Sequence, residues 1–255
     1  MTTSFPTVDR EFLNRARAAG NVAALTGAGV SAASGIPTFR GADGYWRGND
    51  PMTLASPQGF AADPVLVWEW YAMRRELIDA AAPNGAHVAL AELERRLGAG
   101  RFTLITQNVD GLHRRAGSSQ MLELHGNLTR ASCWAGCGRV WDWQLPLEPL
   151  PPRCACGGLA RPDVVWFGEM LDAEVIGDAH RAAAAAGLLL VVGTSSLVEP
   201  AASLPLVTRS RGGLVVEINP EATPLSALAD LRLAGPADTM LPPLVAALCD
   251  DDGGA

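Results

Sequence analysis

Short apolar runs alternate with segments of helical periodicity along most of the chain. Runs that are hydrophobic on both faces are typical of strands in a parallel sheet that helices cover on both sides. The pattern therefore predicts an α/β fold around one parallel sheet. The expected strands are residues 22–25, 102–105, 121–124, 188–192, 214–218 and 231–233.

Two of the segments between these runs carry helix-start signals. Asp63 followed by Pro64 is typical of an N-cap and a first helical turn, and the apolar positions that follow continue to Leu77. Asn84 is expected to cap the next helix, whose apolar positions reach Leu97.

Composition narrows the chemistry of the chain. The formal net charge is -7, so the surface lacks the basic excess that nucleic acid or an anionic membrane requires. All 20 basic side chains are arginine, which excludes a lysine Schiff base, a Walker lysine and a lysine general base. The N-terminal stretch has charges where a signal peptide needs an apolar core, and the longest apolar run, residues 182–192, is shorter than the ~20 residues of a membrane span. We expect a cytoplasmic monomer with reduced thiols.

A glycine-rich turn, Gly27-Ala28-Gly29, follows the first predicted strand. Such a turn can bring backbone N–H groups against a pyrophosphate, although similar turns also occur without a ligand. A dehydrogenase fingerprint expects an acidic residue about 20 residues further on. Residues 35–46 form a long polar loop there instead, and we expect this loop to be a lid over a cofactor.

Polar side chains follow the second and third predicted strands. Gln107, Asn108 and Asp110 come after the second strand, at the edge where ligand-binding groups of open α/β sheets collect. Amides beside a carboxylate can bind both faces of a carboxamide such as that of nicotinamide; an ordinary polar loop is the alternative. His125 ends the third strand and can act as a general base near pH 7.

The other three histidines are expected to be structural. His87 lies on a predicted helix beside its N-cap, His113 is placed in a solvated loop, and His180 ends a helical stretch.

Six motifs occur in the order in which one enzyme family carries them. They are GAGVSAASGIPTFRG, TQNVDG, LHGN, VVWFGE, GTSS and EIN, and they are spread so that the resemblance they carry extends over nearly the whole chain. On these motifs the chain resembles the sirtuins, which are NAD-dependent protein deacylases. The resemblance implies removal of acyl groups from protein lysines, with nicotinamide and O-acyl-ADP-ribose as products. Protein mono-ADP-ribosylation and a non-enzymatic binding module that responds to NAD or ADP-ribose are the alternatives.

The resemblance also implies which residues act on NAD. His125 is expected to be the general base, while Asn108 and Asp110 hold and twist the nicotinamide carboxamide and Gln107 orients the ribose. The other implied contacts surround the phosphates, the riboses and the adenine. They are Gly27, Ala28, Gly29, Ile36, Phe39, Arg40, Trp46, Gly193, Thr194, Ser195, Asn219 and Ala237.

The acyl-lysine peptide is expected to pair with the extended backbone of residues 165–169. Val165, Phe167, Gly168 and Glu169 would then line the added strand. A buried hinge is the alternative reading of this apolar segment.

Tyr71 and Arg74 match a Tyr-x-x-Arg pair of the sirtuin branch that removes succinyl and malonyl groups. Residues three apart on a helix share a face, so a phenol and a guanidinium can converge on one carboxylate. The alternative is a solvated arginine beside a core tyrosine, with Arg75 as a neighbour. We expect desuccinylase and demalonylase activity, with deacetylation retained.

Four cysteines gather in a proline-rich stretch that has no clear periodicity. Cys133, Cys137, Cys154 and Cys156 supply four soft ligands, enough for one closed, structural zinc site in a zinc-ribbon-like module. Sirtuins usually carry two CxxC pairs, whereas here one spacer is a residue longer and the other a residue shorter. A strained zinc site, or a module held by packing of Trp134, Trp141 and Trp143, therefore stays open.

The expected organisation has four parts. A discontinuous Rossmann-like domain comprises residues 1–40, 86–130 and 163–249, and residues 41–85 form a cofactor loop and helical insert. Residues 131–162 form the zinc-binding module, and residues 250–255 form a disordered tail.

Overall fold

The computed structural model describes residues 5–37, 48, 50–98 and 100–249. Its larger lobe is built on a six-stranded sheet in the order β3-β2-β1-β7-β8-β9, in which every neighbouring pair is parallel. The strands are β1 (Val22–Thr26), β2 (Phe102–Thr106), β3 (Met121–Glu123), β7 (Leu188–Val192), β8 (Leu214–Ile218) and β9 (Leu231–Leu233). All six strands predicted from the apolar runs are confirmed.

The order of the strands changes direction between β1 and β7. From β1 the chain builds outward to β2 and β3, whereas β7, β8 and β9 follow on the other side. Thr26 and Val192, the last residues of β1 and β7, are register partners. Ligands of open α/β sheets bind beyond the carboxyl ends of the strands at such a switch point. The functional site is therefore expected at this edge.

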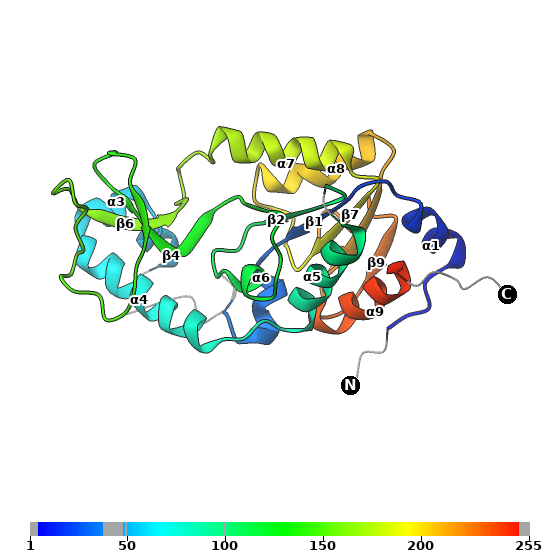
Figure 1. Ribbon diagram of the computed structural model, residues 1–255, viewed down its shortest axis with the longest axis horizontal. Helices are drawn as coiled ribbons and strands as arrows, with labels where there is room; N and C mark the ends of the chain where they lie inside the picture. Colours follow the sequence, from blue (N-terminus) through cyan, green and yellow to red (C-terminus); the bar gives the residue numbers. More distant parts are fainter. Residues whose placement is uncertain (1–4, 38–47, 49, 99, 250–255) are drawn as a thin grey trace.

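Helices cover both faces of the sheet, as predicted. α1 (Arg10–Arg17), α5 (Gly85–Leu97) and α9 (Ala237–Cys249) lie on one face, and α7 (Ala173–Ala185) and α8 (Leu204–Ser210) lie on the other (Figure 1). Successive strand side chains point to opposite faces, which produces two cores. Ala24 belongs to the core with Leu90 of α5, whereas Leu25 belongs to the core with Ala183 of α7.

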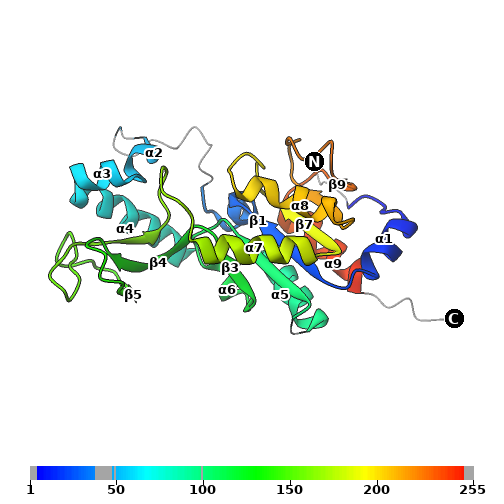
Figure 2. The ribbon, with the colours of Figure 1, turned by 90° about the horizontal axis from the view of Figure 1, so that it is seen from above.

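The smaller lobe lies at one end of the molecule's long axis (Figure 2). It contains α2 (Pro51–Leu54), α3 (Pro57–Ala62) and α4 (Pro64–Ala80), together with an antiparallel sheet of β4 (Gly126–Cys133), β5 (Val140–Asp142) and β6 (Ala160–Val164). A third core fills this lobe, where Trp68 packs edge-on against Trp143. The indole N–H of Trp68 donates to the carbonyl of Ala160 at 2.9 Å, which ties α4 to the sheet.

Side-chain caps begin α4 and α5 where the sequence predicts them. Asp63 accepts a hydrogen bond from the Leu66 N–H, and Asn84 accepts one from the Ala86 N–H, each at 2.9 Å. These bonds satisfy N–H groups that a helix start leaves without an intrahelical acceptor. The remaining short elements are η1 (Ala28–Ser34), α6 (Leu112–Arg115) and η2 (Ala201–Ser203).

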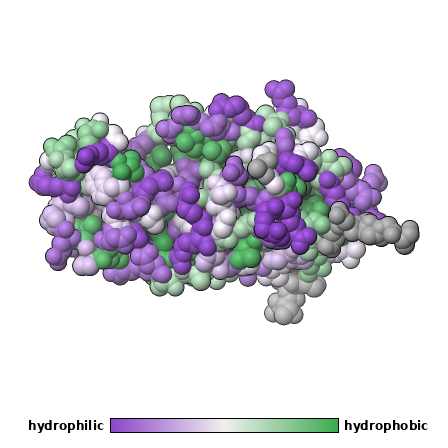
Figure 3. Space-filling view, in the orientation of Figure 1, coloured by the Kyte–Doolittle hydropathy of each residue, from purple (hydrophilic) through white to green (hydrophobic). Residues whose placement is uncertain are grey.

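No helix in the described part of the chain is both long and apolar enough to cross a bilayer. Hydrophobic and hydrophilic residues are interspersed over the face seen in Figure 3. Most of the predicted lid and the tail predicted at 250–255 lie outside the described residues.

Candidate functional site

Two glycine-containing loops meet at the switch point of the sheet. The Gly29 N–H donates to the carbonyl of Gly193 at 2.8 Å. A Cβ added to Gly29 would lie 2.8 Å from that same oxygen, and one added to Gly27 would lie 2.9 Å from it. Gly193 itself has a φ of +61°, and a Cβ there would lie 2.4 Å from the Val30 nitrogen. Only glycine allows this approach, which brings the start of η1 against the end of β7.

The other residues implied to bind the adenosine side lie around this contact. Asn219 donates from Nδ2 to the Thr194 carbonyl at 2.8 Å, so it holds the loop that follows β7. Ser195 is half-buried in that loop, and Ala237 is the buried first residue of α9. Ile36 packs against the core of the smaller lobe. The expected contacts Phe39, Arg40 and Trp46 lie outside the described residues.

The amides that follow β2 lie at the same edge of the sheet. Gln107 donates from Nε2 to the Thr194 hydroxyl at 3.0 Å, and Asn108 donates from Nδ2 to the Ser31 hydroxyl at 3.2 Å. Ser31 in turn donates to Asp110 Oδ2 at 2.7 Å. The structure therefore brings the predicted amides and carboxylate together with the glycine turn.

Ser31 also joins His87 to this network. The Asn84 N–H donates to Nδ1 of His87 at 3.2 Å, so Nε2 carries the proton and faces the Ser31 hydroxyl at 3.3 Å. Burial lowers the pKa of His87, while the charge of Asp110 opposes that shift. His87 is therefore neutral near pH 7, and its place in the capping box of α5 fits the structural role expected of it.

The prediction of a solvated loop for His113 is wrong. His113 lies on α6 and is only 2% exposed, with Nε2 3.0 Å from the Thr26 hydroxyl. Burial, together with the neighbouring His87, whose ring centroid is 4.7 Å away, lowers the pKa of His113 to about 3. Thr26, Ser31 and His113 were not identified from the sequence as parts of the site. The available sequence signal for them was a polar residue at the end of, or just after, an otherwise apolar segment.

His125 occupies a two-residue turn between β3 and β4. Its Nδ1 lies 2.9 Å from the carbonyl of Gln107. A carbonyl only accepts hydrogen bonds, so Nδ1 carries the proton and the lone pair of the neutral ring is on Nε2. Burial lowers the pKa of His125, and the bond to Gln107 opposes this shift. The ring is thus held as a neutral base.

The backbone around His125 is fixed on both sides. The carbonyl of His125 accepts the Val165 N–H at 2.9 Å. Gly126 has a φ of +77°, and a Cβ there would lie 2.2 Å from the Asp163 carbonyl oxygen. The main chain of His125 is therefore hydrogen-bonded directly to the segment expected to bind the peptide.

That segment is not the continuous extended strand expected. β6 ends at Val164, and Phe167 and Gly168 form a turn, with Gly168 at a φ of +88°. The Phe167 N–H already donates to the Ala55 carbonyl at 2.9 Å. The carboxylate of Glu169 folds back to accept the Trp166 N–H at 2.8 Å, so Glu169 holds the turn.

Tyr71 and Arg74 lie on one face of α4. The Tyr71 side chain is buried, and its hydroxyl oxygen accepts the Trp166 indole N–H at 2.9 Å. Burial raises the pKa of Tyr71 to about 12, and the Arg74 charge opposes this shift. Burial also lowers the pKa of Arg74, whereas Tyr71 and Asp110 raise it. The Arg74 guanidinium lies over the Trp70 ring, 5.0 Å from its centroid.

Arg75 does not compete for that position. Its guanidinium forms an ion pair with Asp79 at 2.8 Å and donates to the Trp143 carbonyl at 2.9 Å. These contacts join α4 to the small sheet, so the role of Arg75 is structural.

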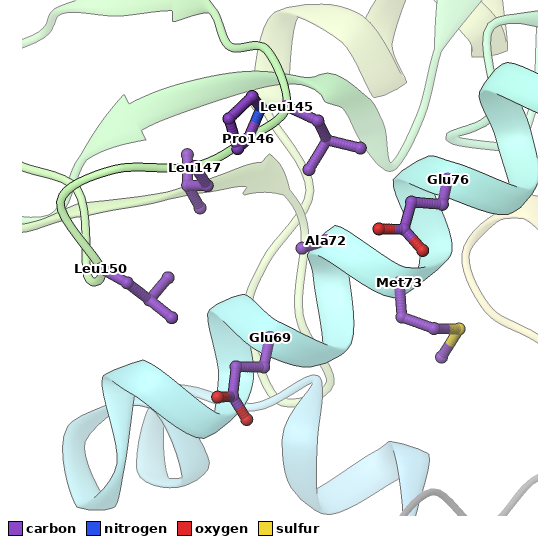
Figure 4. Close-up of a pocket in the computed structure, with 8 residues that line it drawn as sticks. All are labelled: Glu69, Ala72, Met73, Glu76, Leu145, Pro146, Leu147 and Leu150. Carbon is purple, nitrogen blue, oxygen red and sulfur yellow. The ribbon is translucent and has the colours of Figure 1, made fainter.

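A cavity of about 530 Å³ lies on the opposite face of α4 (Figure 4). Glu69, Ala72, Met73 and Glu76 face it from the helix, and Leu145, Pro146, Leu147 and Leu150 face it from the segment between β5 and β6. No residue predicted for the site lines this cavity, so it is separate from the residues gathered at the switch point.

The four predicted cysteines converge at the far end of the smaller lobe. Their sulfur atoms all lie within 4.8 Å of one another, with Sγ–Sγ distances of 3.5 Å for Cys133 and Cys156 and 3.6 Å for Cys137 and Cys154. A disulfide would need about 2.05 Å, whereas the edge of a tetrahedral zinc–thiolate site is about 3.8 Å. The donor set therefore fits one zinc ion.

Glycines explain how the irregular spacing closes. Gly136 and Gly138 flank Cys137 at positive φ, and Gly157 follows Cys156 at a φ of +88°. Such backbone turns absorb the longer and shorter spacers. Tryptophan packing is present as well, since the ring centroid of Trp134 lies 5.1 Å from that of Phe60.

The chain is similar to known proteins over most of its length. The Sir2 family model matches residues 27–200. An NAD-dependent protein deacylase of Thermus thermophilus is 54% identical over 226 residues, which are 88% of this chain and 88% of that protein. NAD-dependent protein deacylase 1 of Archaeoglobus fulgidus is 50% identical over 240 residues, 93% of this chain and 97% of that protein.

Solved structures agree with these sequence matches. The crystal structure of a Sir2 homologue in complex with NAD has a TM-score of 0.89 at 48% identity and covers 96% of both chains. A mutant Sir2 homologue in complex with 2′-O-acetyl ADP ribose has a TM-score of 0.89 at 47% identity, covering 97% of this chain and 100% of that one.

Proposed function

The chain belongs to the Sir2 family, and from that premise we propose that it is an NAD-dependent protein deacylase with His125 as its general base. The observation that carries the assignment is the fixed tautomer of His125, whose Nδ1–H is held by Gln107 while the ring stays neutral. A neutral imidazole with a free lone pair is the form that accepts a proton near pH 7.

NAD is expected beyond the carboxyl ends of β1 and β7, at the switch point of the sheet. When bound, it supplies an anomeric carbon that accepts the acyl oxygen and a nicotinamide that leaves. The close contact of Gly27 and Gly29 with Gly193 leaves backbone, rather than side chains, facing the phosphates. Asn108 and Asp110 hold the carboxamide, and Gln107 orients the ribose next to His125.

His125 then takes a proton from a ribose hydroxyl through Nε2. The deprotonated ribose oxygen would then bond to the acyl carbon, and one water would be consumed as the acyl C–N bond breaks, which restores the lysine amine and leaves the acyl group on ADP-ribose. Because the carbonyl of His125 binds the Val165 N–H, the base and the peptide-binding segment keep a fixed spacing.

We further propose that the preferred acyl groups are acidic, such as succinyl and malonyl. Tyr71 and Arg74 share one face of α4. Burial raises the pKa of Tyr71 and lowers the pKa of Arg74. A carboxylate beside the Arg74 guanidinium would gain charge-assisted hydrogen bonds, which are stronger than those between neutral groups. Arg75 is occupied by Asp79 and Trp143, which leaves Arg74 as the arginine for this role. An acetyl group also fits, so deacetylation is retained.

One zinc ion bound by Cys133, Cys137, Cys154 and Cys156 completes the smaller lobe. Four protein ligands close a tetrahedral site, so this ion supports the fold and does not take part in the reaction.

A panel of acetyl-, malonyl- and succinyl-lysine peptides tests the proposal. With NAD, the wild type is expected to release nicotinamide and form the matching O-acyl-ADP-ribose, detected by mass spectrometry, fastest for the acidic acyl groups. His125→Ala should abolish this product. His180→Ala is the matched control, since His180 binds the Ile176 carbonyl on α7.

Two outcomes would overturn the proposal. Labelling of an acceptor protein without O-acyl-ADP-ribose would identify an ADP-ribosyltransferase. Equal product formation by His125→Ala and wild type would remove His125 from the base role.

A further inference from the structure

Trp166 is buried in the core of the smaller lobe, where it contacts α3 and α4. Its side chain is 2% exposed, and its ring centroid lies 5.2 Å from that of Phe60 and 5.9 Å from that of Trp134. The guanidinium of Arg161 lies 3.6 Å over the same ring. Both faces of the indole are therefore packed.

The backbone of Trp166 is fixed by an ion pair. Arg161 donates to Glu169 Oε1 at 2.6 Å and to Oε2 at 2.8 Å, and Glu169 Oε2 accepts the Trp166 N–H at 2.8 Å. Arg161 also donates to the Val164 carbonyl at 2.8 Å. A bidentate pair of this kind has a defined geometry, so it fixes the main chain from which the indole projects.

The one polar atom of the indole is aimed at Tyr71. The indole Nε1–H lies 2.9 Å from the Tyr71 hydroxyl oxygen. Indole nitrogen only donates, so the phenol oxygen must accept this bond. The phenol's own proton then points away from Trp166 and is left to donate to another group.

Arg74 lies one helical turn beyond Tyr71 on the same face of α4, and each of the two side chains shifts the pKa of the other. An acyl carboxylate placed between them would accept from the phenol and from the guanidinium. If the phenol O–H already points toward the carboxylate, the hydrogen bond from Tyr71 forms without the cost of reorienting the hydroxyl.

We propose that Trp166 is a positioning residue for acyl selectivity, whose indole N–H orients the Tyr71 hydroxyl toward the carboxylate of an acidic acyl group. This inference rests on the acidic-acyl preference proposed above. It assigns to the third residue of the VVWFGE motif a role that acts through Tyr71 rather than through the peptide backbone.

Trp166→Phe removes the indole N–H and keeps an aromatic ring between Arg161 and Phe60. We expect kcat/KM for a succinyl peptide to fall about tenfold, corresponding to about 1.4 kcal/mol, mainly through a higher KM. The acetyl peptide should lose much less. Trp134→Phe is the matched control, because Trp134 packs in the same cluster and its loss should leave the succinyl-to-acetyl ratio near that of the wild type.

A double-mutant cycle with Tyr71→Phe separates positioning from packing. If Trp166 acts through Tyr71, adding Trp166→Phe to Tyr71→Phe changes the succinyl-to-acetyl ratio little further. Independent effects of the two substitutions, or equal losses on both peptides for Trp166→Phe, would overturn the inference. Arg161→Met is the second variant if Trp166→Phe does not fold; it keeps the indole, removes its ion-pair clamp and should lower the ratio roughly threefold.

Arg74→Met, measured on the same two peptides, distinguishes the two proposals. Selective loss with Arg74→Met but not with Trp166→Phe or Arg161→Met overturns the role of Trp166 alone. A wild type without acidic-acyl preference, together with equal losses in Arg74→Met, overturns the acidic-acyl proposal and this inference with it.

Discussion

Gly126→Ala places a methyl group where the backbone beside the base has no room for it. The added Cβ would lie 2.2 Å from the Asp163 carbonyl oxygen and 3.0 Å from the Val164 Cα, and residue 126 keeps a φ of +77°. A non-glycine residue in the left-handed region costs about 1–2 kcal/mol. Pushing β6 away adds about 1–3 kcal/mol, as for other overpacked sites.

The total loss of stability is therefore about 3 kcal/mol, which lowers Tm by about 6–12 °C in a chain of this size. Val165, which follows Val164, donates its N–H to the His125 carbonyl. A displacement of β6 should therefore also move His125 and lower the rate of deacylation. Thermal melting and kcat/KM with a succinyl peptide measure both effects.

Gly212→Ala is the matched control for this change. Gly212 has a φ of +82°, but a Cβ there meets nothing within 4 Å, so only the cost of backbone conformation applies. The difference between the two variants isolates the collision with β6. If Gly126→Ala melts within about 1 °C of Gly212→Ala, the close packing inferred at the turn is refuted.

Four further predictions follow from the site. Burial lowers the pKa of His125 from its usual ~6.5, so kcat/KM should be constant above pH 7 and should fall only below pH 6.5, where the imidazole becomes protonated. A kcat/KM that still rises through pH 8 would contradict the assignment of His125 as the general base. Burial lowers the pKa of His113 to about 3, so the unfolded chain takes up a proton below pH 6.5 that the folded chain does not, and stability should decline by about 2 kcal/mol from pH 6.5 to 5. Thermal melts should show a smaller decline in His113→Gln, and an identical decline in both proteins would exclude this source. Cys137→Ser or chelation should remove one zinc per chain by metal analysis and lower Tm, whereas Cys249→Ser should keep the zinc. Arg74→Met should reduce succinyl-peptide turnover roughly tenfold and acetyl-peptide turnover far less, and equal reductions would refute the acyl pocket.

The parallel sheet could be predicted because its strands are buried on both faces, which leaves runs such as residues 188–192 without a polar position. The placement of Gln107 and His125 at one edge followed from the rule that parallel strands end on the same side. His113 was misplaced because two arginines follow it and give its segment a solvated appearance, whereas its burial depends on packing against His87.

Contacts between distant segments carry no local signal. Trp166 and Tyr71 are 95 positions apart, and neither sequence neighbourhood indicates that an indole N–H meets a phenol oxygen. Arg161 was overlooked for the same reason, since its partner Glu169 was assigned to the peptide. The cysteine cluster could be predicted from residue type, but its closure depends on glycine turns at 136, 138 and 157 that spacing alone does not reveal.

The contact between the two glycine loops has a practical consequence for laboratory evolution of this enzyme. Gly27, Gly29 and Gly193 meet backbone to backbone, so a library that varies them samples mostly chains with a displaced β7 loop. Ser195 is half-buried in the loop that follows β7 and does not take part in that contact. A library that fixes the three glycines and diversifies Ser195 should therefore retain far more folded members.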